Sequence, residues 1–267
     1  MSGRFVSGIC LALGTLFAIP SAAQQAASPA REIAAEPANY HLTTGPAPAK
    51  AVKVSILKSY GETSIWDAMS TNWQDFGKRP VTVDQTYINS DFTYKDLVNS
   101  KADVIVLSNP AGGLQQYSPD EIAAVAKYAK KGHTVIGTFV VFQWVGIDNR
   151  GLAPIFGLNS KIEYNTDEVG ISNLFEKHRP KACLLKRIAG DSWQSSGYPE
   201  TQVPATGSWT GHLGKAKAVA ESDNYTGLVG RYDAPTYVAV YISNYPEYNG
   251  GVDDEQLLYN AVTCFAK

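Results

Sequence analysis

The feature that most constrains the fold is a strand, a helix and a second strand that follow one another directly. Residues 102–107 are apolar almost throughout, which is typical of a strand buried on both faces of a sheet. Ser118-Pro119-Asp120-Glu121 combines a helix N-cap, a proline at the first helical position and an acidic first turn, and Gly132 ends the helix. Residues 133–139 then form a second apolar strand. A crossover of this kind predicts two parallel strands joined by a right-handed connection.

Further strands and helices extend the pattern in both directions along the chain. Predicted strands lie at 52–57, 81–88, 216–220, 227–232 and 236–242. Predicted helices lie at 65–76, 94–98 and 253–266. This alternation predicts an α/β fold of the flavodoxin-like type, which is a doubly wound, mainly parallel sheet with helices on both faces. No repeat or linker divides residues 51–267, so we predict one domain there.

The charge balance argues against two classes of protein. The chain has 23 Lys and Arg against 25 Asp and Glu, a formal net charge of −2, and 44% hydrophobic residues. Disordered chains combine low hydrophobicity with high net charge, and nucleic-acid-binding proteins usually carry a basic excess. We therefore expect a folded domain without a nucleic-acid partner.

The first fifty residues predict export. Arg4, the apolar run 5–19 and the small residues before Gln24 are typical of a secretory signal peptide, with cleavage near Ala23. The run is shorter than the roughly 20 residues that a membrane-spanning helix needs, so no membrane span is expected in the mature chain. A buried N-terminal helix is the alternative. Residues 24–50 are rich in Ala and Pro and predict a flexible leader. We predict a secreted or periplasmic protein.

Export also changes how the cysteines are interpreted. Cys10 lies in the predicted signal peptide, which leaves Cys183 and Cys264 as a pair. An even pair in an oxidising compartment predicts a disulfide, here one that closes a loop of about 80 residues. The alternative is a reactive thiol, which needs a nearby base and an electropositive setting that neither local sequence supplies.

Three stretches together resemble the class I glutamine amidotransferase-like superfamily and, within it, the trehalose-utilisation-type branch. They are residues 102–109 followed by Gly112-Gly113, residues 128–137 continuing to 152–157, and residues 237–241 with 254–262. The resemblance covers most of residues 51–267. It implies that the second stretch leads into a tight turn that carries the nucleophile of active members.

The sequence departs from that family at the nucleophile. Active members carry a cysteine in a G-x-C-x-G turn, paired with a histidine. Here the turn reads Gly137-Thr138-Phe139-Val140-Val141, so Phe139 stands in the place of the cysteine. No His-x-Glu pair follows near the end of the domain. We therefore expect no glutamine hydrolysis, and the chain is better interpreted as a binding protein than as an enzyme.

Candidate ligand-binding residues follow the carboxyl ends of the predicted strands, where ligands bind in folds of this type. They combine uncharged polar groups with aromatic rings, a set that suits a carbohydrate or another small polar ligand: Ser59, Tyr60, Glu62, Asn109, Gln143, Trp144 and Asn244, with Glu247 nearby. No cofactor is expected, because the glycine pairs lack phosphate-binding spacing. No metal is expected either, because neither His178 nor His212 has a second ligand nearby in the sequence.

Two other functions stay open. A secreted hydrolase could use a constellation of Glu62, Asp191 and His212, although no serine lies in a G-x-S-x-G turn. The irregular segment 190–214 carries three aromatic residues, among them Trp193, and could form a lid or a partner surface. A module that docks a protein partner is therefore the third interpretation.

Overall fold

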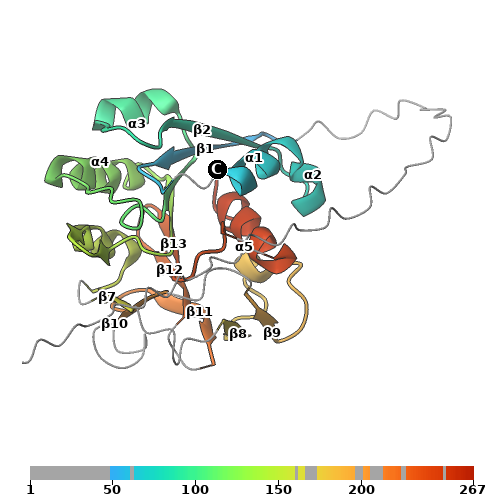
Figure 1. The fold of residues 1–267 in the computed structure, drawn as a ribbon. Helices are drawn as coiled ribbons and strands as arrows, with labels where there is room; N and C mark the ends of the chain where they lie inside the picture. Colours follow the sequence, from blue (N-terminus) through green and yellow to red (C-terminus); the bar gives the residue numbers. More distant parts are fainter. Residues whose placement is uncertain are drawn as a thin grey trace, which may run out of the picture. The chain divides into compact units, whose positions relative to one another are not determined.

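A nine-stranded sheet forms the centre of the described part of the chain (Figure 1). The structure is a computed structural model that describes residues 49–60, 63–159, 162–165, 173–195, 201–204, 213–223, 227–248 and 251–267. The chain divides into two units, Met1–Thr44 and Gly45–Lys267, and every described residue belongs to the second. The predicted signal peptide and nearly all of the leader lie outside the described residues.

Five strands form the parallel part of the sheet, in the order β2-β1-β3-β4-β13. Their bounds are β1 Val52–Leu57, β2 Val81–Tyr87, β3 Val104–Ser108, β4 Thr134–Thr138 and β13 Val238–Ile242. Numbered along the chain, this is the order 2-1-3-4-5, the order of flavodoxin-like sheets. In such sheets the carboxyl ends of all parallel strands meet at one edge, which places the segments after β1, β3, β4 and β13 together.

The other strands pair antiparallel to one another. The sheet continues from β13 through β12, β11 and β8 to β9. Their bounds are β8 Leu174–Lys177, β9 Ser192–Gln194, β11 Lys217–Ser222 and β12 Leu228–Asp233. Two small ribbons stand apart: β5 Gln143–Trp144 with β6 Ile147–Asp148, and β7 Ile162–Asn165 with β10 Thr201–Pro204. The predicted parallel arrangement thus holds for β1 to β4 and β13, and the antiparallel extension was not predicted.

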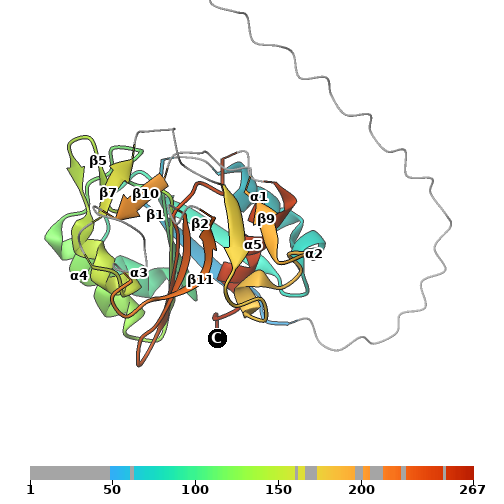
Figure 2. The same ribbon diagram turned by 90° about the horizontal axis from the view of Figure 1, so that it is seen from below.

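Helices cover both faces of the parallel strands, as Figures 1 and 2 show. One face carries α1 Ser64–Thr71, α2 Trp73–Phe76 and α5 Val252–Thr263, and the other carries α3 Tyr94–Ser100, α4 Pro119–Ala129 and the 3₁₀ helix η1 Arg150–Phe156. Strand residues alternate between two apolar clusters. In β3, Val104 and Val106 pack with the first group of helices, and Ile105 and Leu107 pack with the second.

The local signals for α4 are confirmed. The Ser118 side chain accepts a hydrogen bond from the Glu121 backbone N–H, and the Glu121 carboxylate accepts one from the Ser118 backbone N–H at 2.8 Å. Gly132, with a φ of 102°, follows the helix. By contrast, the helix predicted over 65–76 is divided. Asn72 leaves helical geometry at φ −119° and ψ 32° and separates α1 from α2. Asparagine favours such breaks because its side chain competes for backbone hydrogen bonds.

A disulfide joins Cys183 to Cys264, as predicted, with 5.9 Å between the Cα atoms. Cys183 begins the short 3₁₀ helix η2 Cys183–Leu185, and Cys264 directly follows α5. The bond therefore ties the end of the chain to the connection between β8 and β9.

Trp193 corrects one interpretation of the sequence. It is buried and stacks on Phe175 with 5.1 Å between ring centroids, so it belongs to the core and not to a lid. Trp193 is the one buried residue of the short strand β9. The polar residues on either side of it made this strand resemble a loop in the sequence.

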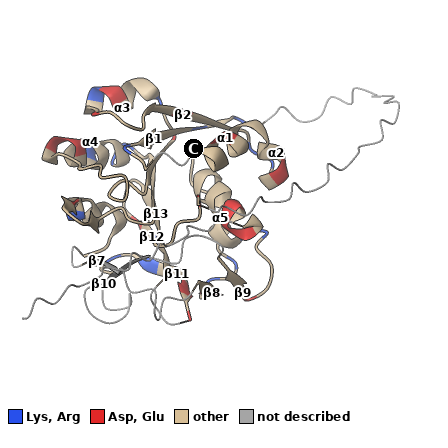
Figure 3. Cartoon of the chain, viewed as in Figure 1, with Lys and Arg blue, Asp and Glu red and all other residues tan. Residues whose placement is uncertain are grey.

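Basic and acidic residues both occur along α3 and α4 (Figure 3). In the described part of the chain, no helix has the length and apolar character that crossing a membrane requires.

Candidate functional site

Three neighbouring parallel strands end in unusual backbone conformations. Lys58 after β1, Asn109 after β3 and Phe139 after β4 have φ angles of 39°, 47° and 53°. Glycine and, less often, asparagine adopt this left-handed region readily, whereas for other residues it costs about 1–2 kcal/mol. Strained backbone of this kind concentrates at functional sites. The carboxyl edge of the parallel strands is therefore the place to look for one.

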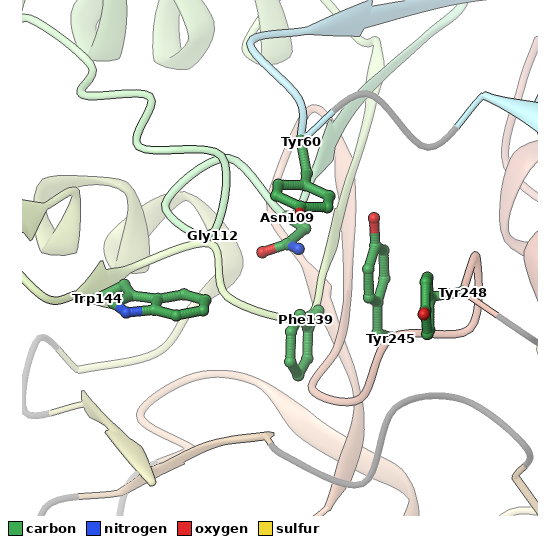
Figure 4. A pocket seen from close by; sticks show the side chains of 7 residues that line it. All are labelled: Tyr60, Asn109, Gly112, Phe139, Trp144, Tyr245 and Tyr248. Carbon is green, nitrogen blue, oxygen red and sulfur yellow. The ribbon is translucent and has the colours of Figure 1, made fainter. Parts of the chain in front are cut away.

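A cavity of about 280 Å³ lies at this edge. Its walls are mostly aromatic, as Figure 4 shows, and the lining residues are Tyr60, Asn109, Gly112, Phe139, Trp144, Tyr245 and Tyr248. They come from the segments after β1, β3, β4 and β13 and from β5. The volume is close to the lower end of the range for small-molecule sites, about 300–1,000 Å³.

Asn109 places an amide in the middle of these rings (Figure 4). Its backbone N–H donates to the Thr138 carbonyl at 3.1 Å, and its own carbonyl accepts from the Gly113 N–H at 3.3 Å. A Cβ at Gly112 would lie 2.2 Å from Asn109 Oδ1, so only glycine leaves room for the amide. The Asn109 residue is 3% exposed, and its Oδ1 has no hydrogen-bond partner among the described residues. A buried acceptor of this kind is costly unless a ligand or a water donates to it.

Three of the rings form a stack. Phe139 lies parallel to Tyr245 with centroids 5.0 Å apart, and Tyr245 lies nearly parallel to Tyr248 at 5.8 Å. The Phe139 backbone N–H donates to the Ile242 carbonyl at 2.7 Å, which joins the end of β4 to the end of β13. We call Tyr245 and Tyr248 the tyrosine wall of the pocket.

Tyr60 and Trp144 complete the aromatic lining. Tyr60 is 53% exposed, and its backbone N–H donates to the Ser108 carbonyl at 3.3 Å. Trp144 is half-buried and comes from β5. Rings whose faces are partly open to solvent can pack against the apolar face of a ligand.

Glu247 lies between Tyr245 and Tyr248 in sequence but is not one of the residues that line the pocket. It is 4% exposed, and its Oε1 accepts from Ser108 Oγ at 2.8 Å and from Thr138 Oγ1 at 2.5 Å. Burial raises the pKa of Glu247 to about 7, against the lowering effect of the two hydroxyls, and the charge of Asp254 raises the pKa further. Ser108 and Thr138 directly precede the pocket residues Asn109 and Phe139, so this acid connects two strand ends to the tyrosine wall.

The structure brings three of the predicted ligand-binding residues together in the cavity: Tyr60, Asn109 and Trp144. Ser59 is buried next to Tyr60, and Gln143 pairs with Asp148 in the β5–β6 ribbon. Asn244 is also buried, and its side-chain amide donates to Ser195 Oγ. Glu62 lies outside the described residues.

Of the three residues of the alternative catalytic constellation, the structure describes Asp191 alone. Asp191 is exposed, and its backbone carbonyl accepts from the Lys177 N–H at 2.9 Å. Glu62 and His212 both lie outside the described residues. Among the residues that the structure describes, no group of three His, Cys, Asp or Glu side chains could hold a metal ion.

Sequence reasoning considered Phe139 as the replacement of the nucleophile and as a residue that could fill the pocket, but not as part of a ligand-binding lining, and it missed the tyrosine wall. The signal for the wall was available, because Tyr245 and Tyr248 follow the same strand as Asn244 and Glu247. The stack of rings that gives these residues a role depends on contacts between segments about one hundred residues apart in the chain.

No protein-family model matches the chain, and no curated protein matches its sequence. Solved structures do match. The cytoplasmic protein STM3548 of Salmonella typhimurium has a TM-score of 0.55 at 12% identity, over 81% of this chain and 99% of that chain. The cytoplasmic protein STM1381 of Salmonella typhimurium LT2 has a TM-score of 0.54 at 10% identity, over 82% of this chain and 100% of that chain.

A ThuA-like protein of Bacteroides uniformis is also similar, with a TM-score of 0.47 at 12% identity, over 85% of this chain and 94% of that chain. At the identities of the two Salmonella proteins, the likeness extends to the fold alone. This chain therefore shares the fold of the two Salmonella proteins.

Proposed function

We propose that this protein is an exported, non-catalytic, amidotransferase-like domain that binds a small polar ligand, specifically a neutral carbohydrate, at the carboxyl ends of its parallel strands. The observation that carries the proposal is the amide of Asn109. It is buried, its Oδ1 lacks a partner among the described residues, and it lies in a cavity whose other side chains are aromatic rings. Ligand sites typically combine such apolar walls with a few convergent polar groups.

A carbohydrate fits this combination. A sugar ring presents an apolar face of C–H groups that can pack on Tyr60 or Trp144, and its hydroxyls can donate to Asn109 Oδ1. The side chains lining the cavity carry no formal charge at neutral pH. A charged ligand would therefore lose its hydration without gaining an ion pair, which disfavours it. A quaternary ammonium is the exception to test, because aromatic rings also attract cations.

Phe139 and Tyr245 support the non-catalytic part of the proposal. Phe139 keeps the left-handed turn at the end of β4, at the position where the resemblance to amidotransferases would place the cysteine. Tyr245 stacks on Phe139 and stands two residues before Glu247, so this segment carries a tyrosine and no histidine. A phenyl ring has no nucleophilic atom, so the family reaction could not start here. We propose that the turn at Phe139 and the neighbouring Glu247 help to form a binding pocket instead of a catalytic site.

Two observations support export. The first is the sequence of residues 1–23, which has the pattern of a signal peptide. The second is the Cys183–Cys264 disulfide, because disulfides are typical of an oxidising compartment. The 2-1-3-4-5 strand order with helices on both faces supports the doubly wound topology that the amidotransferase-like resemblance implies.

Replacing Asn109 with glycine tests the proposal. Glycine tolerates the φ of 47°, so the variant removes the amide without adding backbone strain. If a sugar hydroxyl donates to the amide, Asn109→Gly should weaken sugar binding roughly tenfold, as measured by titration calorimetry. Lys101→Gly is the matched control, because Lys101 also has a positive φ, 53°, and does not line the cavity.

The control variant should bind as the wild type does. Equal affinity of wild type and Asn109→Gly for every sugar that binds would contradict the assigned site. Tighter binding of choline than of D-glucose or D-galactose would contradict the carbohydrate class.

A further inference from the structure

The tyrosine wall is attached to the rest of the pocket through one carboxyl group. Tyr245 and Tyr248 lie on the short segment 243–248 that follows β13, and Glu247 lies between them in sequence. The Glu247 carboxyl accepts hydrogen bonds from Ser108 at the end of β3 and from Thr138 at the end of β4. It therefore joins the ends of β3 and β4 to the segment that follows β13.

These contacts use only one oxygen of the carboxyl group. Oε1 accepts both hydroxyls, whereas Oε2 is buried and has no hydrogen-bond partner among the described residues. Burying a neutral carboxyl there costs less than burying an ionised carboxylate, which loses far more hydration and has too few donors to compensate.

The surroundings of Glu247 oppose its ionisation. Burial, the largest effect, and the buried carboxyl group of Asp254 on α5 oppose ionisation, and Tyr245 and Tyr248 on its own segment add no positive charge. The hydroxyls of Ser108 on β3 and Thr138 on β4 favour the ionised form, but by less than burial disfavours it. No cation within the described residues pairs with Glu247. The pKa of Glu247 is accordingly raised to about 7, mainly by burial, so the group titrates across the physiological range.

We propose that Glu247 is the positioning residue of the pocket: its protonated form holds the tyrosine wall against the ends of β3 and β4, and its ionisation releases the wall. The part of this proposal that concerns ligand affinity rests on the proposed function. The part that concerns the wall does not.

The sign of the effect follows from linkage. The folded-state pKa of Glu247 is above the ordinary value of 4.5, so the contribution to stability is fully present below 4.5 and is lost as the pH rises through about 7. Near pH 8 Glu247 would be protonated in about one molecule in ten, and only in those molecules would the tyrosine wall stay docked. Since ligand affinity scales with the fraction of binding-competent molecules, sugar affinity should fall about tenfold between pH 6 and pH 8.

Hydrogen exchange on the ligand-free protein tests the wall directly. After correction for intrinsic rates, the backbone N–H groups of residues 243–248, other than Pro246, should lose about tenfold in protection between pH 6 and pH 8 in the wild type. Glu247→Gln mimics the neutral acid and should keep its protection at both pH values. Glu176→Gln, an acid-to-amide change at an exposed residue of β8, is the matched control and should follow the wild type.

Each outcome decides the proposal. If hydrogen-exchange protection of residues 243–248 in the wild type does not change with pH, the proposal is overturned, whatever the variants show. The same loss in Glu247→Gln as in the wild type also overturns it. Titrations with D-glucose and D-galactose at pH 6 and pH 8 then test the affinity. If the protection changes as expected and neither sugar nor any other neutral sugar binds, the proposed function fails while the role of Glu247 stands.

Discussion

Replacing both Cys183 and Cys264 with alanine should lower the free energy of unfolding by about 4 kcal/mol. The two cysteines are separated by 81 residues, so the bond removes many conformations from the unfolded chain. It also anchors the end of α5, whose buried residues Leu257, Leu258 and Val262 pack on one face of the sheet. For a domain of this size the loss corresponds to a decrease in Tm on the order of 10 °C.

Urea unfolding of the wild type and of the double variant measures this difference. Each single alanine variant should be destabilised about as much as the double variant, because either substitution removes the whole bond. The wild type should also match the double variant after reduction. A loss below about 1 kcal/mol in the double variant would contradict a stabilising role for the bond.

Replacing Lys58 with methionine should cost about 3–5 kcal/mol at neutral pH, because it leaves a buried carboxylate without its cation. Lys58 Nζ lies 2.8 Å from Glu121 Oε1, and both side chains are almost fully buried. The same ammonium pairs with the exposed Asp91 at 2.7 Å and donates to the Gln116 carbonyl at 3.1 Å. Burial alone would lower the pKa of Lys58, but its hydrogen bonds and charge interactions with Asp91 and Glu121 raise it overall.

Adding Glu121→Gln to the methionine variant separates charge from packing. The double variant should recover part of the lost stability, because no ionised group is then left buried without a cation. Lys95→Met, at an exposed position on α3, is the control and should change stability by less than about 0.5 kcal/mol. If Lys58→Met is as mild as the control, the buried pair does not stabilise the fold. Lys58 is two residues before Tyr60, so Lys58→Met should also disturb one wall of the pocket.

The parallel part of the fold could be predicted because its signals are local. The capping box of Ser118 and Glu121, the glycine at 132 and the apolar strands on either side define a crossover without reference to distant residues. The antiparallel part could not be predicted in the same way. Its order depends on which short strand pairs with which, and Trp193 shows the difficulty, because its burial against Phe175 comes from a contact between two strands.

Some residues of the candidate site could likewise be predicted from local sequence, whereas others could not. Tyr60, Asn109 and Trp144 were predicted from position alone, since residues after parallel strands gather at one edge. The role of Glu247 was not, because burial and two hydroxyls from other strands determine its pKa. The sequence likewise predicts Phe139 as a lost nucleophile but does not reveal its stacking on Tyr245, which makes it part of the pocket lining.

The most direct test of the central claim is a thermal-shift screen of the purified protein against neutral sugars, amino acids, choline and divalent metals. A ligand present at 100 times its dissociation constant should stabilise the protein by about 2.7 kcal/mol, which raises Tm by roughly 5–10 °C. We expect such a shift with at least one neutral sugar, and we expect it to diminish strongly in Asn109→Gly. No shift with any sugar, or a shift of equal size in Asn109→Gly, would contradict a carbohydrate site at the Asn109 pocket.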